Sequence, residues 1–296
     1  MIFAPPLHRI VEHVDRRVLG AIQFVDAVTA LPVAVAAKAE VRSAVLFDAG
    51  TSDNVPVNRQ SVQLRQNRAG FQVIVSAPFF DEYASSFDIP QDPPAALGGR
   101  RLRLRMVLRD AGPHYLPRAF EFTLPRPVDR AVPENVFQPA RVQLFRAPGA
   151  PVLDGWSVLR VRVTAENDNS VRLPAVHVRV FRSPRGDGDA PIGQGMTEWR
   201  GNLLGEALVG VADLLRFRSG AGDDVFETTQ PVHLEATRDS NFPGAGDQFP
   251  DIPGFALGTR TRRSDPPANV PALVVNPLAP LDLRAGQEAT VHLAMP

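Results

Sequence analysis

Residues 99–110 read GRRLRLRMVLRD, and this stretch decides the fold class. Apolar side chains recur at every second position, and Arg101, Arg103 and Arg105 occupy positions between them. A period of two residues is typical of a β-strand that turns one face to a hydrophobic core and the other to solvent. We therefore predict a half-buried strand, and its inward residues are Leu102, Leu104, Met106 and Leu108.

The same alternation recurs along the chain, and clusters of Gly, Pro, Asn and Asp separate the runs as turns between strands require. Helical spacing is scarce. Residues 4–14 fit a short helix or an extended arm, and residues 205–217 fit a short helix or a strand with a turn. We predict an all-β protein of antiparallel β-sandwiches. Further strands are expected within residues 71–75, 119–124, 157–164, 175–181, 230–237 and 289–293.

Proline and glycine account for 29 and 22 of the 296 residues. Because proline costs about 3 kcal/mol inside a helix, this content excludes a coiled coil or a helical bundle. Two breaks rich in proline, at residues 124–138 and 238–277, divide the chain. We predict a first β-sandwich with an N-terminal arm at residues 1–130, a second β-sandwich at 131–238, and a Pro/Gly-rich extension at 239–296 that ends in a strand.

The charges balance, with 32 basic and 32 acidic residues. No net field draws such a chain to nucleic acid or acidic lipid, so we expect neither as a partner. The absence of cysteine excludes disulfides, thiolate zinc sites and thiol catalysis. No apolar run approaches the ~18 residues of a membrane helix, and the N-terminus lacks the pattern of a signal peptide. We expect synthesis in the cytoplasm and no membrane insertion.

Two stretches of the chain share one plan. Each has a strand, a turn that closes in Leu-Pro, a second strand, and a polar turn that ends in Gly before an apolar strand. The first contains Pro32 and Gly70, and the second contains Pro174 and Gly201. Proline presets φ after the first turn, and glycine supplies a positive φ at a tight hairpin. The shared plan indicates two related β units.

These turns resemble those of the transthyretin-like and carboxypeptidase regulatory-like β-sandwich family. Members carry Asp followed by Thr-Gly-x-Pro at the first turn, and Thr-Asp before a Gly and an aromatic residue at the later hairpin. The chain departs from this pattern at Ala30, where Gly is usual, and at residues 66–67, where Thr-Asp is usual. The resemblance implies a rigid accessory sandwich without an active site of its own. The matching residues are Asp26, Thr29, Pro32, Gly70 and Phe71 in the first stretch and Pro174, Thr197, Glu198 and Gly201 in the second.

Histidines and acidic clusters are the candidate metal ligands. His8 and His13 are five residues apart, which fits neither a zinc-binding helix nor one strand face. His177, His233 and His292 fall at outward strand positions. Ca²⁺ needs six to eight oxygens, so solvated turns are favoured over a Ca²⁺ site, and we expect no metal or cofactor. The acidic clusters are residues 166–169, 187–189 and 223–224.

The sequence also lacks the local signatures of common enzymes. It contains no G-x-S-x-G elbow, no H-E-x-x-H pair and no Walker loop. We therefore predict that the protein is not an enzyme. A pair of carboxylates that meet only in space stays open as an alternative.

The arginines Arg101, Arg103 and Arg105 form the candidate partner-binding site. Such a row of guanidinium groups could bind phosphate, lipopolysaccharide or an acidic neighbouring subunit. The alternative is a solvated face whose charges are neutralised by carboxylates on adjacent strands.

In style the chain also resembles structural proteins of phage tails and of phage-tail-like contractile injection particles. The shared features are the missing signal peptide, the missing cysteines and the proline-rich arms. This resemblance implies a non-catalytic structural or adaptor subunit of the baseplate or spike region, released with the particle. It would bind other subunits through strand edges and proline-rich arms. The alternatives are a freestanding carbohydrate- or surface-binding module and, third, an enzyme with a spatially assembled carboxylate site.

Overall fold

The structure, a computed structural model, is built from β-strands. The only helices in its described part are two short 3-10 turns, η1 (Arg59–Ser61) and η4 (Gly201–Leu203). The prediction of an all-β protein is thus confirmed. In those same ranges, no helix has the length and apolar character needed to cross a membrane. The described residues are 18–48, 54–80, 99–125, 138–182, 190–211, 214, 216–219, 224–239, 249–250 and 273–295.

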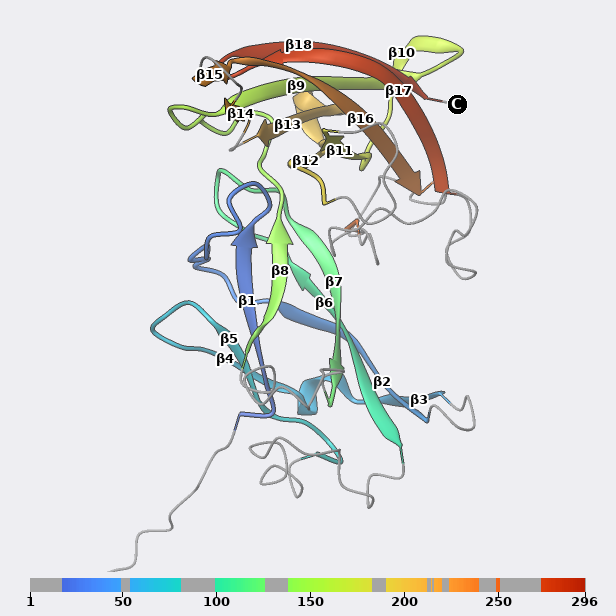
Figure 1. Ribbon diagram of the computed structural model, residues 1–296. Coiled ribbons are helices and arrows are strands. Elements are labelled where there is room, and N and C mark those ends of the chain that lie inside the picture. Colours follow the sequence, from blue (N-terminus) through green and yellow to red (C-terminus); the bar gives the residue numbers. More distant parts are fainter. Residues whose placement is uncertain are drawn as a thin grey trace, which may run out of the picture.

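Two four-stranded sheets form the first β unit (Figure 1). Their inner faces share one core, in which the rings of Phe24 and Phe120 meet edge to face at 5.8 Å. Their orders are β4-β5-β1-β8 and β3-β2-β6-β7. The bounds are β1 (Gly20–Asp26), β2 (Glu40–Asp48), β3 (Asn54–Val57), β4 (Gln63–Gln66), β5 (Gln72–Ser76), β6 (Arg100–Leu108), β7 (Arg118–Leu124) and β8 (Ala140–Leu144).

The alternation in residues 99–110 predicts β6 correctly. Leu102, Leu104, Met106 and Leu108 are fully buried in the core, and Arg101, Arg103 and Arg105 are exposed. Burial of four large apolar side chains on one strand stabilises the fold by roughly 1.5–3 kcal/mol each.

One eight-stranded sheet forms the second β unit, in the order β10-β9-β13-β12-β11-β16-β17, with β18 on β9. Figure 1 shows this sheet curving over the end of the first unit. The bounds are β9 (Ser157–Ala165), β10 (Asp168–Arg172), β11 (His177–Phe181), β12 (Gly193–Met196), β13 (Glu206–Val211), β16 (Thr229–Asp239), β17 (Leu273–Arg284) and β18 (Glu288–Met295); β14 (Arg216–Ser219) and β15 (Asp224–Glu227) form a separate hairpin.

The expected second antiparallel sandwich is not confirmed, because the strands of this unit join in one sheet. Its core contains residues from β9, β11, β13, β16, β17 and β18. A register shift between His233 and Glu235 marks a bulge in the long β16–β17 ladder, and bulges increase the local bend and twist of a strand. Two strand pairs are also parallel, β1 with β8 and β9 with β18.

Strand pairing crosses the expected domain limits. β8 lies beyond residue 130 yet pairs with β1 of the first unit. The expected extension contributes two strands to the second unit, because β17 pairs with β16 and β18 pairs with β9. The limits at residues 130 and 238 stay a prediction. Of the two ambiguous segments, residues 206–211 form strand β13, and residues 4–14 lie outside the described residues.

Glycines let β12 approach β13 closely. A Cβ atom on Gly193 would lie 2.6 Å from the carbonyl oxygen of Gly210, and one on Gly195 would lie 2.6 Å from that of Leu208. These distances are well inside van der Waals contact, and the atoms met are backbone atoms that cannot rotate away. The two glycines of the Gly-Gln-Gly sequence therefore allow β12 to pack closely on β13.

We expect Gly195→Ala to destabilise the protein by about 1–3 kcal/mol, because the added methyl group overpacks the β12–β13 contact. The matched control is Gly149→Ala, whose Cβ would be 3.8 Å from Leu203. We expect the control to stay within about 0.5 kcal/mol of wild type. Urea unfolding measures both. Equal stability of the two variants would contradict the role of close approach at β12.

Candidate functional site at the junction of the two β units

The sequence-predicted candidates do not converge on one site. Arg101, Arg103 and Arg105 lie on the outer face of β6, and the Arg103 guanidinium stacks over the Phe47 ring at 4.6 Å. His8 and His13 lie outside the described residues.

The structure describes only some of the acidic clusters. Residues 166–169 are exposed, and Asp168 Oδ1 accepts hydrogen bonds from the Ser170 backbone N–H and hydroxyl at 2.8 and 2.6 Å. These bonds lower the pKa of Asp168 and are typical of a turn. Residues 187–189 and 223 lie outside the described residues, and so does the side chain of Asp224. Across the described ranges no group of three or more His, Asp or Glu is placed to hold a metal.

The expected outward position of His177 is wrong, because this side chain is fully buried. Val178 and Val180 point into the core of the second unit as the alternation predicts. The opposite face of β11 is covered as well, and the Phe145 ring from the first unit lies 5.1 Å from the His177 ring. The first unit covers the other face of β11. Alternation within one strand cannot indicate that a second layer packs on its outward face.

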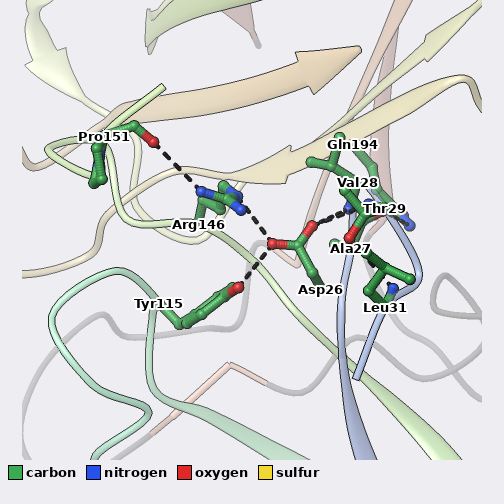
Figure 2. A network of polar contacts seen from close by, with 9 residues as sticks. All are labelled: Asp26, Ala27, Val28, Thr29, Leu31, Tyr115, Arg146, Pro151 and Gln194. Carbon is green, nitrogen blue, oxygen red and sulfur yellow. Dashed lines mark hydrogen bonds and ion pairs between the residues drawn. The ribbon is translucent and has the colours of Figure 1, made fainter. Parts of the chain in front are cut away.

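A buried carboxylate, Asp26 at the end of β1, organises the polar part of the junction (Figure 2). Its Oδ1 accepts hydrogen bonds from the backbone N–H groups of Val28 at 2.8 Å and Thr29 at 3.0 Å. Its Oδ2 accepts from the Tyr115 hydroxyl at 2.8 Å and from Arg146 Nε at 2.9 Å. Each oxygen thus accepts two hydrogen bonds, so the carboxylate keeps its partners despite its burial.

Arg146 carries this network toward the second unit. Its guanidinium is 4.5 Å from the Trp156 ring centre, and its Nη1 donates to the Pro151 carbonyl at 3.4 Å. Trp156 directly precedes β9, where it packs with Val28 from the first unit and Leu208 from β13. The residues at the end of β1 therefore help to position Trp156, from which the chain continues into β9 of the second unit.

The contact with Asp26 also affects the pKa of Tyr115. Burial raises the pKa of the Tyr115 hydroxyl to about 12, and the hydrogen bond to Asp26 adds to the increase. The hydroxyl remains protonated at neutral pH, so it remains a donor to the carboxylate.

A second polar group crosses the junction at Gln194 on β12. Its Nε2 donates to the Ala27 carbonyl at 3.2 Å and to Gln143 Oε1 at 2.9 Å, and both acceptors belong to the first unit. Its Oε1 lies 3.3 Å from His177 Nε2. Since the Gln194 amide uses its nitrogen as donor, its oxygen accepts from His177, which assigns the proton of the neutral imidazole to Nε2.

Burial lowers the pKa of His177 to about 3, and the nearby positive charge of Arg179 contributes to the decrease. Arg179 in turn forms a cross-strand ion pair with Glu235 on β16. The imidazole is therefore neutral at pH 7, and protonating it would place a second positive charge beside Arg179 in a buried site.

Apolar side chains fill the rest of the junction. Phe249 is buried against the ring of Trp199, and the Ala119 N–H donates to the Pro250 carbonyl at 3.1 Å, which joins residues 249–250 to β7. The cluster comprises Ala27, Val107, Leu116, Ala119 and Phe145 from the first unit with Ala175, Met196, Trp199 and Phe249. The junction is thus a packed core with two polar networks.

Chemically, this arrangement holds chain segments in place. The carboxylate of Asp26 is committed to four donors, and the Gln194 amide is committed to its three partners. Sequence reasoning singled out Asp26 as a turn residue, and the Asx turn is present. Arg146 and Gln194 were not predicted, since single polar residues without a repeated spacing leave no local signal.

Comparisons with known proteins add little. No family model matches the chain, and no curated protein matches it. The Bacillus anthracis TIE protein is 8% identical with a TM-score of 0.19, over 93% of this chain and 33% of that chain. A leucine-rich repeat protein from Bacteroides thetaiotaomicron is 7% identical with a TM-score of 0.19, over 95% of this chain and 26% of that chain. The chain thus spans about a third and about a quarter of their lengths, and neither similarity supports an argument.

We expect Asp26→Ala to destabilise the protein by about 3–5 kcal/mol, because it leaves the buried Arg146 guanidinium without its carboxylate. The control is Glu288→Ala, which removes the carboxylate of a half-exposed pair with Arg160 and should cost less than about 1 kcal/mol. Urea unfolding followed by tryptophan fluorescence reports both. A cost for Asp26→Ala no larger than the control would show that the network does not hold the junction.

We expect the buried His177 to make the folded protein less stable in acid. Because its folded pKa of about 3 lies below the ordinary 6.5, its contribution is complete above pH 6.5 and falls as the pH decreases toward 3. Each pH unit below 6.5 lowers the free energy of unfolding by about 1.4 kcal/mol, so the loss is about 2 kcal/mol at pH 5. His177→Gln, which cannot titrate, should flatten this slope in unfolding experiments between pH 7 and 5. The exposed control His114→Gln should keep the wild-type slope, and an unchanged slope in His177→Gln would refute the assignment.

Proposed function

We propose that the protein is a non-catalytic structural or adaptor subunit of a phage-tail-like contractile injection particle, in its baseplate or spike region. The observation that carries this proposal is the junction. Its apolar cluster and the hydrogen bonds of Gln194 join the two β units, as a part that positions neighbouring subunits requires. The composition supports the same role, with its balanced charge and proline-rich arms.

Strand edges offer the means of binding. β3, β4, β7 and β8 end the two sheets of the first unit. The chain already uses one such edge on itself, because the Ala119 N–H of β7 donates to the Pro250 carbonyl while the adjacent Phe249 ring is buried. Within this molecule, a proline-containing segment thus docks on a strand edge. The proposed contacts with neighbouring subunits are of the same kind.

A freestanding carbohydrate-binding module is the alternative, and it has less support. Such modules present exposed aromatic rings to sugars. Here Trp156 and Trp199 are both buried, and the hydroxyl of Tyr115 is bound to Asp26. An enzyme with a spatially assembled pair of carboxylates comes third.

Affinity capture of the tagged protein from its native host tests the proposal. We expect recovery of sheath, tube or spike proteins, and sedimentation of the protein with large particles from a lysate. A strain that expresses the tag alone is the control. A monomer that recovers no such partner would contradict the proposal, and micromolar binding on a glycan array would favour the carbohydrate-binding module.

A further inference from the structure

Three arginines lie in a row on the outer face of β6 and form the arginine stripe: Arg101, Arg103 and Arg105. All three are exposed, and alternate residues on a strand are roughly 6.8 Å apart. Residues directly opposite in register share the face of the stripe. The flanking positions are mostly uncharged, and they are Ser43, Val45 and Phe47 on β2 and Glu121 and Thr123 on β7.

Strand β9 shows outward arginines that are neutralised by the fold itself. Arg160 and Arg162 alternate on β9, and both are ion-paired across the sheet. Arg160 pairs with Glu288 of β18 at 2.6 Å, and Arg162 pairs with Glu206 of β13 at 3.1 Å. Carboxylates on the two neighbouring strands thus match the charges of β9.

The arginine stripe differs from this pattern. Within the described part of the structure, no carboxylate lies within 4.0 Å of its guanidinium nitrogens, although Glu121 stands opposite Arg105. Neighbouring like charges repel one another and cost stability. Arg103 is also held in place over the Phe47 ring. An ordered row of positive charge that no described carboxylate neutralises is complementary to a negatively charged partner.

We infer that the arginine stripe binds an extended acidic segment of a neighbouring protein, whose carboxylates stand at alternate positions. This inference rests on the proposed function and names the kind of partner. An extended strand spaces alternate side chains by the same roughly 6.8 Å as β6, so each guanidinium can meet one carboxylate. Arginine suits this role because its planar fork donates hydrogen bonds to both oxygens of a carboxylate.

The surroundings favour a protein over a nucleic acid or a sulfated polysaccharide. Val45 and Phe47 flank the stripe, and such half-buried apolar groups suit the side chains that alternate with carboxylates on a peptide. Stacking with nucleobases needs open aromatic faces, and the Phe47 ring is already covered by Arg103.

Fluorescence anisotropy with labelled peptides tests the inference. The probe is a peptide of about twelve residues that alternates Glu and Thr, and the control peptide has the same composition in two blocks. We expect the alternating peptide to bind at least tenfold more tightly than the block peptide. Added salt should weaken this binding. Arg103→Gln combined with Arg105→Gln should weaken it at least tenfold, and Arg65→Gln with Arg68→Gln, at exposed positions on and after β4, by less than twofold.

Several results would overturn the inference. One is equal binding of the two peptides, and another is an equal loss in the two double variants. Tighter binding of heparin or oligothymidylate than of the alternating peptide would assign the stripe to a polyanion instead. A clear fall in the melting temperature of Arg103→Gln with Arg105→Gln would show that the arginines serve the fold. Each failure leaves the proposed function standing, because affinity capture from the host tests that function separately.

Discussion

The buried carboxylate of Asp26 ties together the end of the first β unit on which the second unit packs, and the junction is built on it. Its four donors come from the turn after β1, from Tyr115 before β7 and from Arg146 after β8, so the network forms only when these segments have assembled. Hydrogen bonds to a charge gain strength away from water, and an unpaired buried charge is costly. Arg146 then stacks on Trp156, which directs the chain into β9.

A rigid relation between the units follows from the way polar and apolar contacts share the junction. Apolar packing alone is not directional, whereas the hydrogen bonds of Gln194 to Ala27 and Gln143 specify one relative orientation. The outer face of β6 and the curved sheet of the second unit are thereby presented together. Such a molecule is suited to hold neighbours at a set distance, which agrees with the proposed role as an adaptor.

Much of the fold could be predicted from the sequence where the signal is local. The alternation of Leu102 with Arg103 identified β6 and its buried face. The turn residue Asn67, whose Oδ1 accepts from the Ala69 and Phe71 N–H groups, lies in the β4–β5 hairpin expected from its neighbour Gly70. The prediction failed at His177, because the second face of β11 is buried by the other unit. The single eight-stranded sheet was also not predicted, since it depends on pairing between strands far apart in the sequence, such as β9 with β18.

Two-residue periodicity and turn chemistry act between neighbours in the chain, so the sequence alone was enough to establish an all-β protein and the outward row of arginines. The junction depends on residues that are distant in sequence. Tyr115 and Arg146 lie 89 and 120 positions from Asp26, and β18 follows β9 by more than a hundred residues. Contacts across such separations leave no local pattern, and only the folded chain shows that a turn residue also ties together the end of the first unit at the junction.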